Sequence, residues 1–559
     1  MRHFYILFLL FLLIVDAHAQ SPKSEIRAVW LTTIGGLDWP HSYNEKEQRA
    51  ELCHILDRLQ KVGINTVLLQ TRIRATTIYP SALEPWDGCL SGTPGKAPRY
   101  DALQLAIDEC HKRGMQLHAW VVTIPIGKWN QLGCMQLRKK HPKLVKRIGE
   151  EGYLNPENPE TANYLAQCCH EIVKNYDVDG IHLDYIRYPE TWPKADRRGR
   201  NSRNASTPAQ RRACITSIVR AIGKAVKSEK PWVMLSCSPI GKHDDLSRYR
   251  SGGWNARSAV SQDAQAWLRL GLMDALFPMM YFRDNQFFPF AIDWQEQAAG
   301  RFVVPGLGIY FLDPKEGRWT LDIISRQMNV VRQLGMGHCF FRYKFLNDNK
   351  KGIYDFTQYF NATPALIPAM SWLSSAAPTP PQHISLSQGM LCWSGARDNS
   401  SGSYLLYNIY ASEDFPVDIT NAANLVRSRL QANQLQVPTD GRMNYAVTAQ
   451  DRFGQESPQA AQLLVNAGQS LRVKNRIART NGTTITLPAK PSTLDAPFVI
   501  VETLQGRPVT TFAYDDKPKD ISALPEGIYQ LRSLGKKGRT HRIGFFTIKR
   551  KKEPATTTL

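Results

Sequence analysis

The sequence predicts an α/β protein in which a (β/α)8 TIM barrel is followed by two small all-β sandwich domains. Between residues 26 and 361, short apolar runs alternate with amphipathic helical stretches, and eight such runs are the number that closes a parallel barrel. The connections that enter the runs are short, whereas those that leave them are long. Beyond residue 383 the chain changes to short alternating segments separated by turns, a pattern typical of β-sandwiches.

The eight apolar runs have the length and composition of buried strands. They are Ile26–Thr33, Thr66–Arg72, Gln116–Thr123, Gly180–Tyr185, Trp232–Ser238, Ala275–Tyr281, Val303–Tyr310 and Gly337–Tyr343. The helix before the fourth run is well marked, because Asn158 can cap it and Pro159 suits its first turn. The long connections, such as 75–99, 124–158, 189–208 and 239–261, all leave the carboxyl ends of the runs. Since that end carries the active face of such barrels, the asymmetry favours an enzyme or a ligand binder.

The first residues carry the pattern of a secretory signal peptide. Arg2 and His3 precede the apolar run 4–15, and Ala17-His18-Ala19 provides a small-x-small cleavage site, so residues 1–19 are excluded from the fold. No later apolar stretch is long enough to span a bilayer, and no transmembrane segment is expected. We therefore expect an exported protein located in the periplasm, at the cell surface or outside the cell.

The chain is strongly basic, with 70 Lys and Arg against 49 Asp and Glu and a net charge of +21. Two loops that leave predicted strands, 138–147 and 194–212, concentrate positive charge on the same rim of the barrel. This favours an anionic ligand over the alternative of charge that serves only solubility. Nucleic acid is not expected as a partner, because none of the usual nucleic-acid-binding motifs is present.

The central motif of the chain is the fourth run with its continuation, residues 179–189. With a period of two, Ile181, Leu183 and Tyr185 share the apolar outer face, whereas His182 and Asp184 point into the barrel. Asp184 stands at the carboxyl end of the strand, where a carboxylate has no packing use and chemistry is done. It is therefore the first candidate catalytic residue, oriented by His182, Tyr185 or Arg187, and the alternative is an Asp that only caps the following loop.

Further candidates stand at the ends of other runs. The predicted substrate-binding residues are Arg72, Arg74, Trp120, His182, Tyr185, Arg187 and Tyr281. Aromatic rings beside polar groups suit sugars, whose C–H faces stack on the ring while their hydroxyl groups bind the polar side chains. The alternative for Trp120 and Tyr281 is that both are core aromatics.

Several motifs resemble the glycosyl hydrolase-like 10 family of (β/α)8 putative glycosidases. They are Ile26-Arg27-Ala28-Val29-Trp30-Leu31, Leu117-His118-Ala119-Trp120, Tyr153-Leu154-Asn155-Pro156 and above all residues 179–189, and the resemblance covers residues 24–365. The resemblance implies a barrel glycosidase with its acid at Asp184, and it links the substrate to peptidoglycan glycan strands that lack peptides. Where family members often continue His-Ala-Trp into Asn-Pro-Tyr-Arg, this chain departs with residues 121–127, so no substrate contact is carried over there.

The C-terminal part divides into three predicted segments. Residues 366–382 are rich in Pro, Ala and Ser and are read as a linker. Residues 383–466 resemble a fibronectin type III domain in the spacing of their strands. Residues 467–559 resemble the C-terminal secretion-tail modules of Bacteroidetes, through the stretches 504–509 and 524–529.

The leading hypothesis is an exported glycoside hydrolase acting on an anionic or cell-wall glycan. Hydrolysis of a glycosidic bond needs a second carboxyl group, for which Asp284 is the first choice and Asp244, Asp245 and Asp313 are rivals. The alternative is a non-catalytic glycan-binding protein that uses the barrel as a platform, which the lack of a second acid near Asp184 would favour. A deacetylase-type hydrolase is disfavoured, because the sequence lacks the cluster of metal ligands expected of such an enzyme. No cofactor or metal is predicted.

Overall fold

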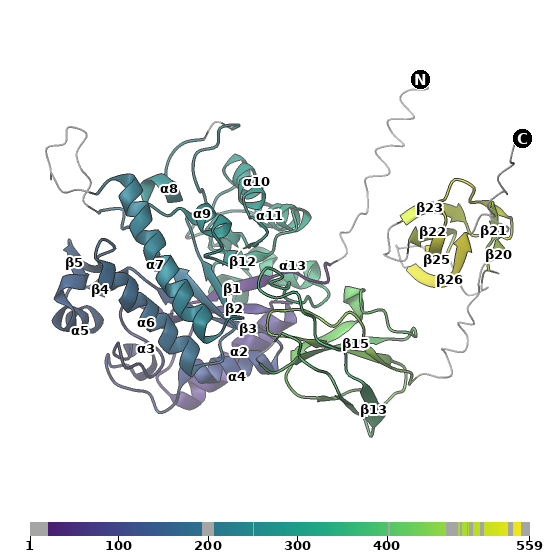
Figure 1. The fold of residues 1–559 in the computed structure, drawn as a ribbon, viewed down its shortest axis with the longest axis horizontal. Coiled ribbons are helices and arrows are strands. Elements are labelled where there is room, and N and C mark those ends of the chain that lie inside the picture. The colour runs from purple at the N-terminus through teal and green to yellow at the C-terminus, as the bar shows by residue number, and fades with distance from the viewer. Residues whose placement is uncertain are drawn as a thin grey trace, which may run out of the picture. The chain divides into compact units, whose positions relative to one another are not determined.

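The computed structural model describes residues 21–192, 206–249, 251–400, 403–465 and, with short gaps, 479–548 (Figure 1). The predicted signal peptide, residues 1–19, lies outside the described residues. In the described part of the chain, nine strands form one parallel sheet with the order β10-β9-β8-β7-β3-β2-β1-β12-β11. The strands are β1 (Arg27–Leu31), β2 (Thr66–Arg72), β3 (Gln116–Val122), β7 (Gly180–Asp184), β8 (Met234–Cys237), β9 (Ala275–Leu276), β10 (Phe302–Val303), β11 (Gly306–Leu307) and β12 (His338–Phe340).

The two end strands of this sheet are consecutive in the chain. β10 and β11 are separated only by Val304 and Pro305, while β10 pairs with β9 and β11 pairs with β12. The sheet is therefore a parallel one of at least half-barrel extent, and it is consistent with a TIM barrel.

Helices follow the strands and cover the outer face of the sheet. The longer ones are α2 (Glu45–Lys61), α4 (Ala102–Lys112), α6 (Pro159–Asn175), α7 (Pro208–Glu229), α10 (Phe288–Glu296), α11 (Leu321–Gln333) and α13 (Ile353–Phe360). Helices α6 and α7 lie side by side (Figure 1). The predicted start of α6 is confirmed, because the Asn158 side chain accepts a hydrogen bond from the Glu160 amide and Pro159 occupies the first turn.

The strand residues divide between two apolar layers, as their alternation predicts. Ile181 and Leu183 pack in the layer between sheet and helices. Trp30, Leu68 and Phe277 pack in a separate layer on the inner face of the sheet. His182 and Asp184 accordingly point inward. Tyr185 is the exception to the predicted alternation, because β7 ends at Asp184 and Tyr185 adopts a positive φ of 52°.

The long connection after β3 carries a small antiparallel sheet of its own. Its strands are β4 (Pro125–Lys128), β5 (Val145–Ile148) and β6 (Glu151–Leu154), in the order β4-β6-β5. A short helix, α5 (Leu132–Lys140), lies between β4 and β5 in the chain. The Leu154 amide donates to the Ile124 carbonyl at 2.8 Å, so this sheet is fastened to the residues that follow β3.

The remaining strands are antiparallel and form the extra all-β part of the chain. One sheet contains β13 (His383–Ser387), β14 (Met390–Ser394) and β17 (Gln434–Gln436), and another contains β15 (Leu406–Ser412), β16 (Leu425–Leu430), β18 (Asn444–Gln450) and β19 (Ala461–Leu463). Further along the chain, β20 (Arg479–Thr480), β21 (Thr484–Thr486) and β24 (Lys519–Asp520) form a third. A fourth contains β22 (Phe498–Thr503), β23 (Pro508–Ala513), β25 (Gly527–Leu534) and β26 (Thr540–Ile548).

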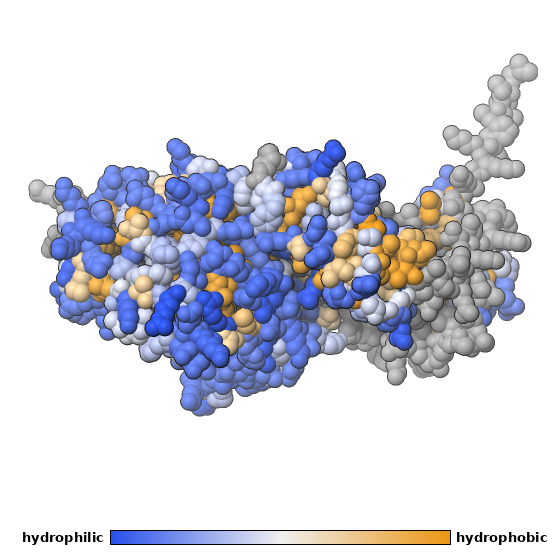
Figure 2. Space-filling view, turned by 90° about the horizontal axis from the view of Figure 1, so that it is seen from below, coloured by the Kyte–Doolittle hydropathy of each residue, from blue (hydrophilic) through white to orange (hydrophobic). Residues whose placement is uncertain are grey.

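The chain forms two compact units. The first joins the parallel sheet and its helices to most of the strands β13–β19, and the second contains β20–β26. The face shown in Figure 2 is mostly hydrophilic over the described residues, with hydrophobic side chains in small patches. Within the described ranges, no helix combines the length and apolar character that crossing a membrane requires.

Buried ion pairs hold strands β13–β19 against the amino end of β7. The carboxylate of Asp179 accepts hydrogen bonds from Arg429 Nη2 at 2.6 Å and from Arg452 Nη2 at 3.3 Å. His111 Nε2 lies 2.8 Å from its other oxygen, which also accepts from the Leu117 amide at 3.0 Å. Burial alone would raise the pKa of Asp179, but His111 and the two arginines outweigh it and lower that pKa far below its ordinary value.

Candidate active site

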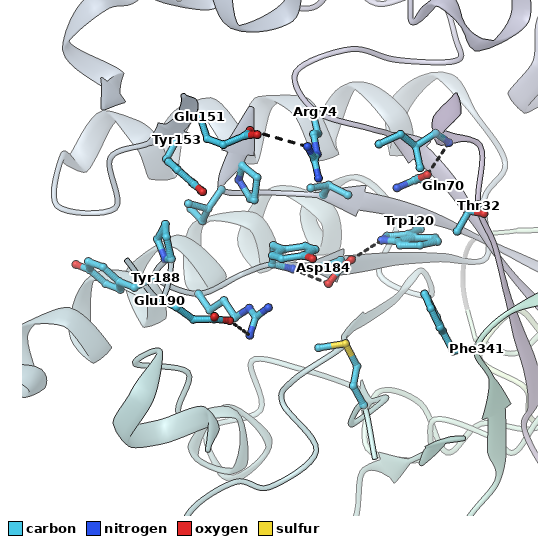
Figure 3. Close-up of a pocket in the computed structure, with 18 of the residues that line it drawn as sticks. Thr32, Gln70, Arg74, Trp120, Glu151, Tyr153, Asp184, Tyr188, Glu190 and Phe341 are labelled. Atoms are coloured by element: carbon cyan, nitrogen blue, oxygen red, sulfur yellow. Dashed lines mark hydrogen bonds and ion pairs between the residues drawn. The ribbon is translucent and has the colours of Figure 1, made fainter. Parts of the chain in front are cut away.

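A cavity of about 600 Å³ lies where the parallel strands end (Figure 3). Its floor comes from the ends of β3 and β7, and its walls come from the loops after β1, β2, β9 and β12 and from the small sheet β4-β6-β5. The residues used below that line it are Arg74, Trp120, Glu151, Tyr153, Asp184, Tyr185, Arg187, Glu190 and Tyr281. The cavity therefore occupies the active face of a TIM-barrel-like sheet.

Asp184 lies at the centre of the cavity, and its carboxylate is held by three donors. Trp120 Nε1 donates to Oδ2 at 3.1 Å, while Ser238 Oγ and the Tyr185 amide donate to Oδ1 at 3.0 and 2.7 Å. Tyr185 itself lies beyond the end of β7 and has a left-handed backbone, with a φ of 52°. Burial raises the pKa of Asp184, and Arg187 and the three donors offset part of that rise.

The end of β7 is also fixed through its backbone. The carbonyl oxygen of Asp184 accepts hydrogen bonds from the Thr123 amide at 2.9 Å and from the Thr123 hydroxyl at 2.8 Å. The carboxylate therefore has a defined position, and only 6% of the residue is exposed. A polar side chain so well supported at the floor of a cavity is suited to chemistry rather than to packing.

Five of the seven predicted substrate-binding residues line this cavity: Arg74, Trp120, Tyr185, Arg187 and Tyr281. Tyr185 is 41% exposed, and its ring lies beneath the guanidinium of Arg187. The Arg187 Nη1 atom is buried and has no hydrogen-bond partner among the described residues. The buried hydroxyl of Tyr281 likewise has no partner there. The described residues therefore leave the hydrogen bonds of both groups incomplete, although Arg187 Nη1 also lies 3.9 Å from Glu190.

Arg72 and His182 do not reach the cavity. Arg72 is fully buried, where Nη2 and Nε donate to the carboxylate of Glu84 at 2.6 and 2.8 Å. Its third nitrogen, Nη1, donates to the carbonyls of Val122 and Thr123 and so supports the end of β3. Arg72 is therefore a structural residue rather than a substrate contact, since the loop after β2 supplies its counter-ion.

His182 lies one layer below the cavity, inside the sheet. Trp30 Nε1 donates to His182 Nε2 at 3.2 Å, so that nitrogen is an acceptor, and Nδ1 lies 3.0 Å from Ser236 Oγ. Because the indole is only a donor, His182 is neutral with its proton on Nδ1. Burial, with a smaller effect of His118, lowers its pKa well below the ordinary value. Its inward direction agrees with the prediction, but it supports the site from below.

The predicted second acid, Asp284, is not brought to the cavity. β9 ends at Leu276, and the chain turns outward into a 3-10 helix, Asp284–Gln286, where the Asp284 side chain is 59% exposed beside Arg283 and Arg326. Its rivals are also elsewhere. Asp244 pairs with Arg257 at 2.8 Å and Asp313 with Lys350 at 2.9 Å, and Asp245 does not line the cavity.

Two other carboxyl groups line the cavity instead, and neither was predicted. Glu151 begins β6 and lies 3.9 Å from Arg74, with its side chain 34% exposed. Glu190 follows the β7 motif and lies 3.9 Å from Arg187, with its side chain 60% exposed. Both surround the space beside Asp184 (Figure 3). They come from long loops, for which strand periodicity gives no direction.

The two basic loops are described to different extents. In the loop 138–147, Lys139, Lys140 and Lys143 are exposed, and Arg138 stacks on Trp129 with its guanidinium 4.3 Å from the ring centre. Most of the loop 194–212, through residue 205, lies outside the described residues. The expected continuous basic rim therefore stays a prediction.

A cavity at the carboxyl ends of a parallel sheet, lined by carboxyl groups and aromatic rings, is the architecture of a glycan-acting hydrolase. The glycosyl hydrolase-like 10 family matches residues 25–310, and the chain belongs to that family. Glycosyl hydrolase YngK of Bacillus subtilis (strain 168) is 31% identical over an alignment of 396 residues, which covers 66% of this chain and 77% of YngK.

Two further similarities extend this comparison. Glycosyl hydrolase DigH of Escherichia coli (strain K12) is 30% identical over an alignment of 296 residues, which covers 47% of this chain and 67% of DigH. Among solved structures, the PgaB (BpsB) glycoside hydrolase domain from Bordetella bronchiseptica is 13% identical with a TM-score of 0.40, covering 60% of this chain and 98% of that domain.

Proposed function

We propose that the protein is an exported glycoside hydrolase whose catalytic carboxylate is Asp184. The observation that carries the proposal is the position of Asp184, fixed by three donors at the centre of a cavity that two further carboxyl groups line. These acids favour hydrolysis over a non-catalytic glycan-binding platform, which needs no second acid. We also propose that the parallel sheet is a closed (β/α)8 barrel, joined through the segment 302–307.

In this mechanism Asp184 acts as the ionised carboxylate. Its three hydrogen-bond donors and the nearby Arg187 favour the negative charge against the cost of burial. Asp184 would attack the anomeric carbon or activate a water molecule that does so, while the leaving oxygen takes a proton from the second acid. Glu151 and Glu190 replace Asp284 as the candidates for that acid, because both border the space beside Asp184.

The substrate is proposed to be an anionic glycan of the cell wall, such as peptidoglycan strands that lack peptides. Arg187 supports this, because its Nη1 atom is buried at the cavity without a hydrogen-bond partner among the described residues. A carboxylate on a sugar ring would complete its hydrogen bonds. Tyr281, Tyr185 and Tyr153 offer rings for stacking against sugar faces.

The remaining parts are assigned to export and retention. Residues 1–19 would direct the chain out of the cytoplasm, which places the enzyme in the periplasm or at the cell surface. Residues 383–466 are proposed to be a fibronectin type III-like sandwich and residues 467–559 a module of the secretion-tail type. No catalytic role is assigned to either.

The decisive experiment is incubation of the full-length chain with a panel of glycans that includes peptide-free peptidoglycan, with the products identified by mass. Asp184→Asn keeps the shape and removes the charge, and it should reduce turnover by several powers of ten. Glu151→Gln and Glu190→Gln identify the proton donor, since its loss is tolerated on substrates with good leaving groups. Asp284→Asn is the matched control on the surface. Full activity of Asp184→Asn on an established substrate would exclude this site.

A further inference from the structure

A second cavity, of about 790 Å³, adjoins the one around Asp184. The two share Ile34 and Arg74 in their linings, so they lie next to each other. Each alone falls within the roughly 300–1,000 Å³ that ligand pockets occupy. Together they offer more space than a small substrate needs, which fits a chain-like ligand that extends past the reaction centre.

The second cavity contains an aromatic ring with one face supported and the rest of the ring exposed. Tyr43 lines this cavity and is 69% exposed. A Cβ atom at Gly92 would stand 3.2, 3.3 and 3.4 Å from three adjacent ring atoms of Tyr43. Such similar distances place Gly92 over the face of the ring. Since Gly92 has a positive φ of 76° and no side chain, the ring can rest directly on its backbone.

Besides Arg74 and His41, the surroundings of Tyr43 offer uncharged groups that suit hydroxyl and amide groups. The exposed amide side chains of Asn130 and Gln131 line the same cavity. The carboxylate lining it, Asp87, is already engaged by the Thr76 hydroxyl at 2.7 Å and by the Cys89 amide at 2.9 Å. Asp87 is therefore committed to the local fold and is not a second reaction centre.

Two glycines form part of the wall of the second cavity. Gly35 and Gly36 line the second cavity next to Ile34, and a Cβ atom at either position would meet no other atom within 4 Å. Both adopt a positive φ, at 58° and 67°, which makes any larger residue unfavourable there. The wall at this point consequently consists of bare backbone, which allows close approach of a ligand.

We propose that this second cavity is a distal glycan subsite, in which the exposed face of Tyr43 stacks on a sugar ring of the same chain whose cleavage occurs at Asp184. The inference rests on the proposed function and deepens it. The substrate is a polysaccharide long enough to occupy both cavities, and the distal part is recognised through C–H faces, hydroxyl groups and amides. The enzyme therefore discriminates by chain length, and short oligosaccharides gain nothing from the distal subsite.

The test compares peptide-free peptidoglycan strands separated into short and long fractions, using the full-length protein. Tyr43→Ala should raise KM for the long fraction about tenfold, the effect of losing one aromatic stack, and should leave kcat and the short fraction unchanged. Tyr43→Trp should retain the wild-type preference for long strands. Tyr359→Ala is the matched control, because Tyr359 on α13 is 65% exposed and lines neither cavity.

Binding without turnover separates this proposal from the assignment of the enzyme. The same fractions are titrated against Asp184→Asn with and without Tyr43→Ala. A loss of affinity that is confined to long strands supports the subsite, whether or not the wild-type protein cleaves this polymer. If the wild-type protein binds but does not cleave it, only the proposed function is refuted. If the wild-type protein cleaves the polymer and Tyr43→Ala changes KM equally for both fractions, or for neither, the subsite is refuted and the assignment as a hydrolase is unaffected. Absence of any length-dependent binding also overturns it.

Discussion

Replacing Arg429 by methionine should destabilise the first compact unit without affecting its chemistry. Arg429 and Asp179 have side chains that are 5% and 2% exposed, and their atoms lie 2.6 Å apart. Methionine keeps most of the buried volume but removes the charge. The Asp179 carboxylate would retain Arg452 and His111, but its shortest ionic contact would be lost. This site lies at the end of β7 opposite Asp184, so activity per folded molecule should persist.

The size of the effect follows from the burial. Removing one partner of a buried ion pair costs about 3–5 kcal/mol, and the remaining partners of Asp179 place this case near 3 kcal/mol. With an unfolding entropy of about 2.1 cal/mol/K per residue, a unit of more than four hundred residues loses roughly 3 °C in Tm for that free energy. The free energy of unfolding is thus a more sensitive measure than Tm.

Denaturant unfolding of Arg429→Met at several pH values provides the assay. Arg427→Met is the matched control, because Arg427 is exposed on the same strand, β16. The pKa of Asp179 is depressed in the folded protein, so its contribution is full above its unfolded pKa of about 3.9 and is lost as pH falls. The difference between Arg429→Met and wild type should therefore narrow below about pH 4. A deficit no larger than that of Arg427→Met at neutral pH would refute the reasoning.

Three further predictions concern the cavity itself. Ser238→Ala removes a donor that lowers the pKa of Asp184, so the acidic limb of the kcat/KM profile should move to higher pH, and an unmoved limb would argue against an ionised Asp184. Tyr281→Phe removes a buried hydroxyl without a partner in the described residues, so KM should rise while Tm stays the same or increases; a fall in Tm would show that the hydroxyl is structural. Arg187→Gln should raise KM for peptide-free peptidoglycan more than for uncharged chitin-type chains, and equal effects on both polymers would remove the argument for an anionic substrate.

The fold was predictable wherever a long segment repeats its apolar residues with a single period. The alternation of residues 180–184 placed His182 and Asp184 inside the sheet, and the structure agrees. The same pattern stopped being informative at Tyr185, which lies beyond the end of β7 and has a left-handed backbone. A strand periodicity describes only residues that remain in the strand. The position of the central acid followed from the strand, whereas the arrangement of its immediate neighbours did not.

The second acid could not be predicted, because distance along the chain does not determine how a loop folds. Asp284 follows the sixth run, but β9 is short and the chain has turned to the surface before residue 284. Glu151 belongs to a sheet inserted in the loop after β3, and Glu190 follows Pro189. Arg72 shows the same limit, since its partner Glu84 lies in a loop. Alternation also gave the wrong direction for Arg72, because a register shift between Gln70 and Arg72 pairs Arg72 with Val121 and turns it toward Glu84 and the α6 residue Tyr164.

The ion pairs at the amino end of β7 have an evolutionary consequence. An appended domain joined only by a linker can be exchanged or lost by recombination without effect on the enzyme. Here Arg429 and Arg452 neutralise a carboxylate that belongs to the parallel sheet, so a lineage that dropped strands β13–β19 would have to replace Asp179 as well. Asp179 and its two arginines should therefore be inherited together or disappear together among homologues. A homologue that keeps Asp179 but has no cation at the positions of Arg429 and Arg452 would contradict this expectation. It would show that strands β13–β19 can be exchanged in spite of the buried ion pairs.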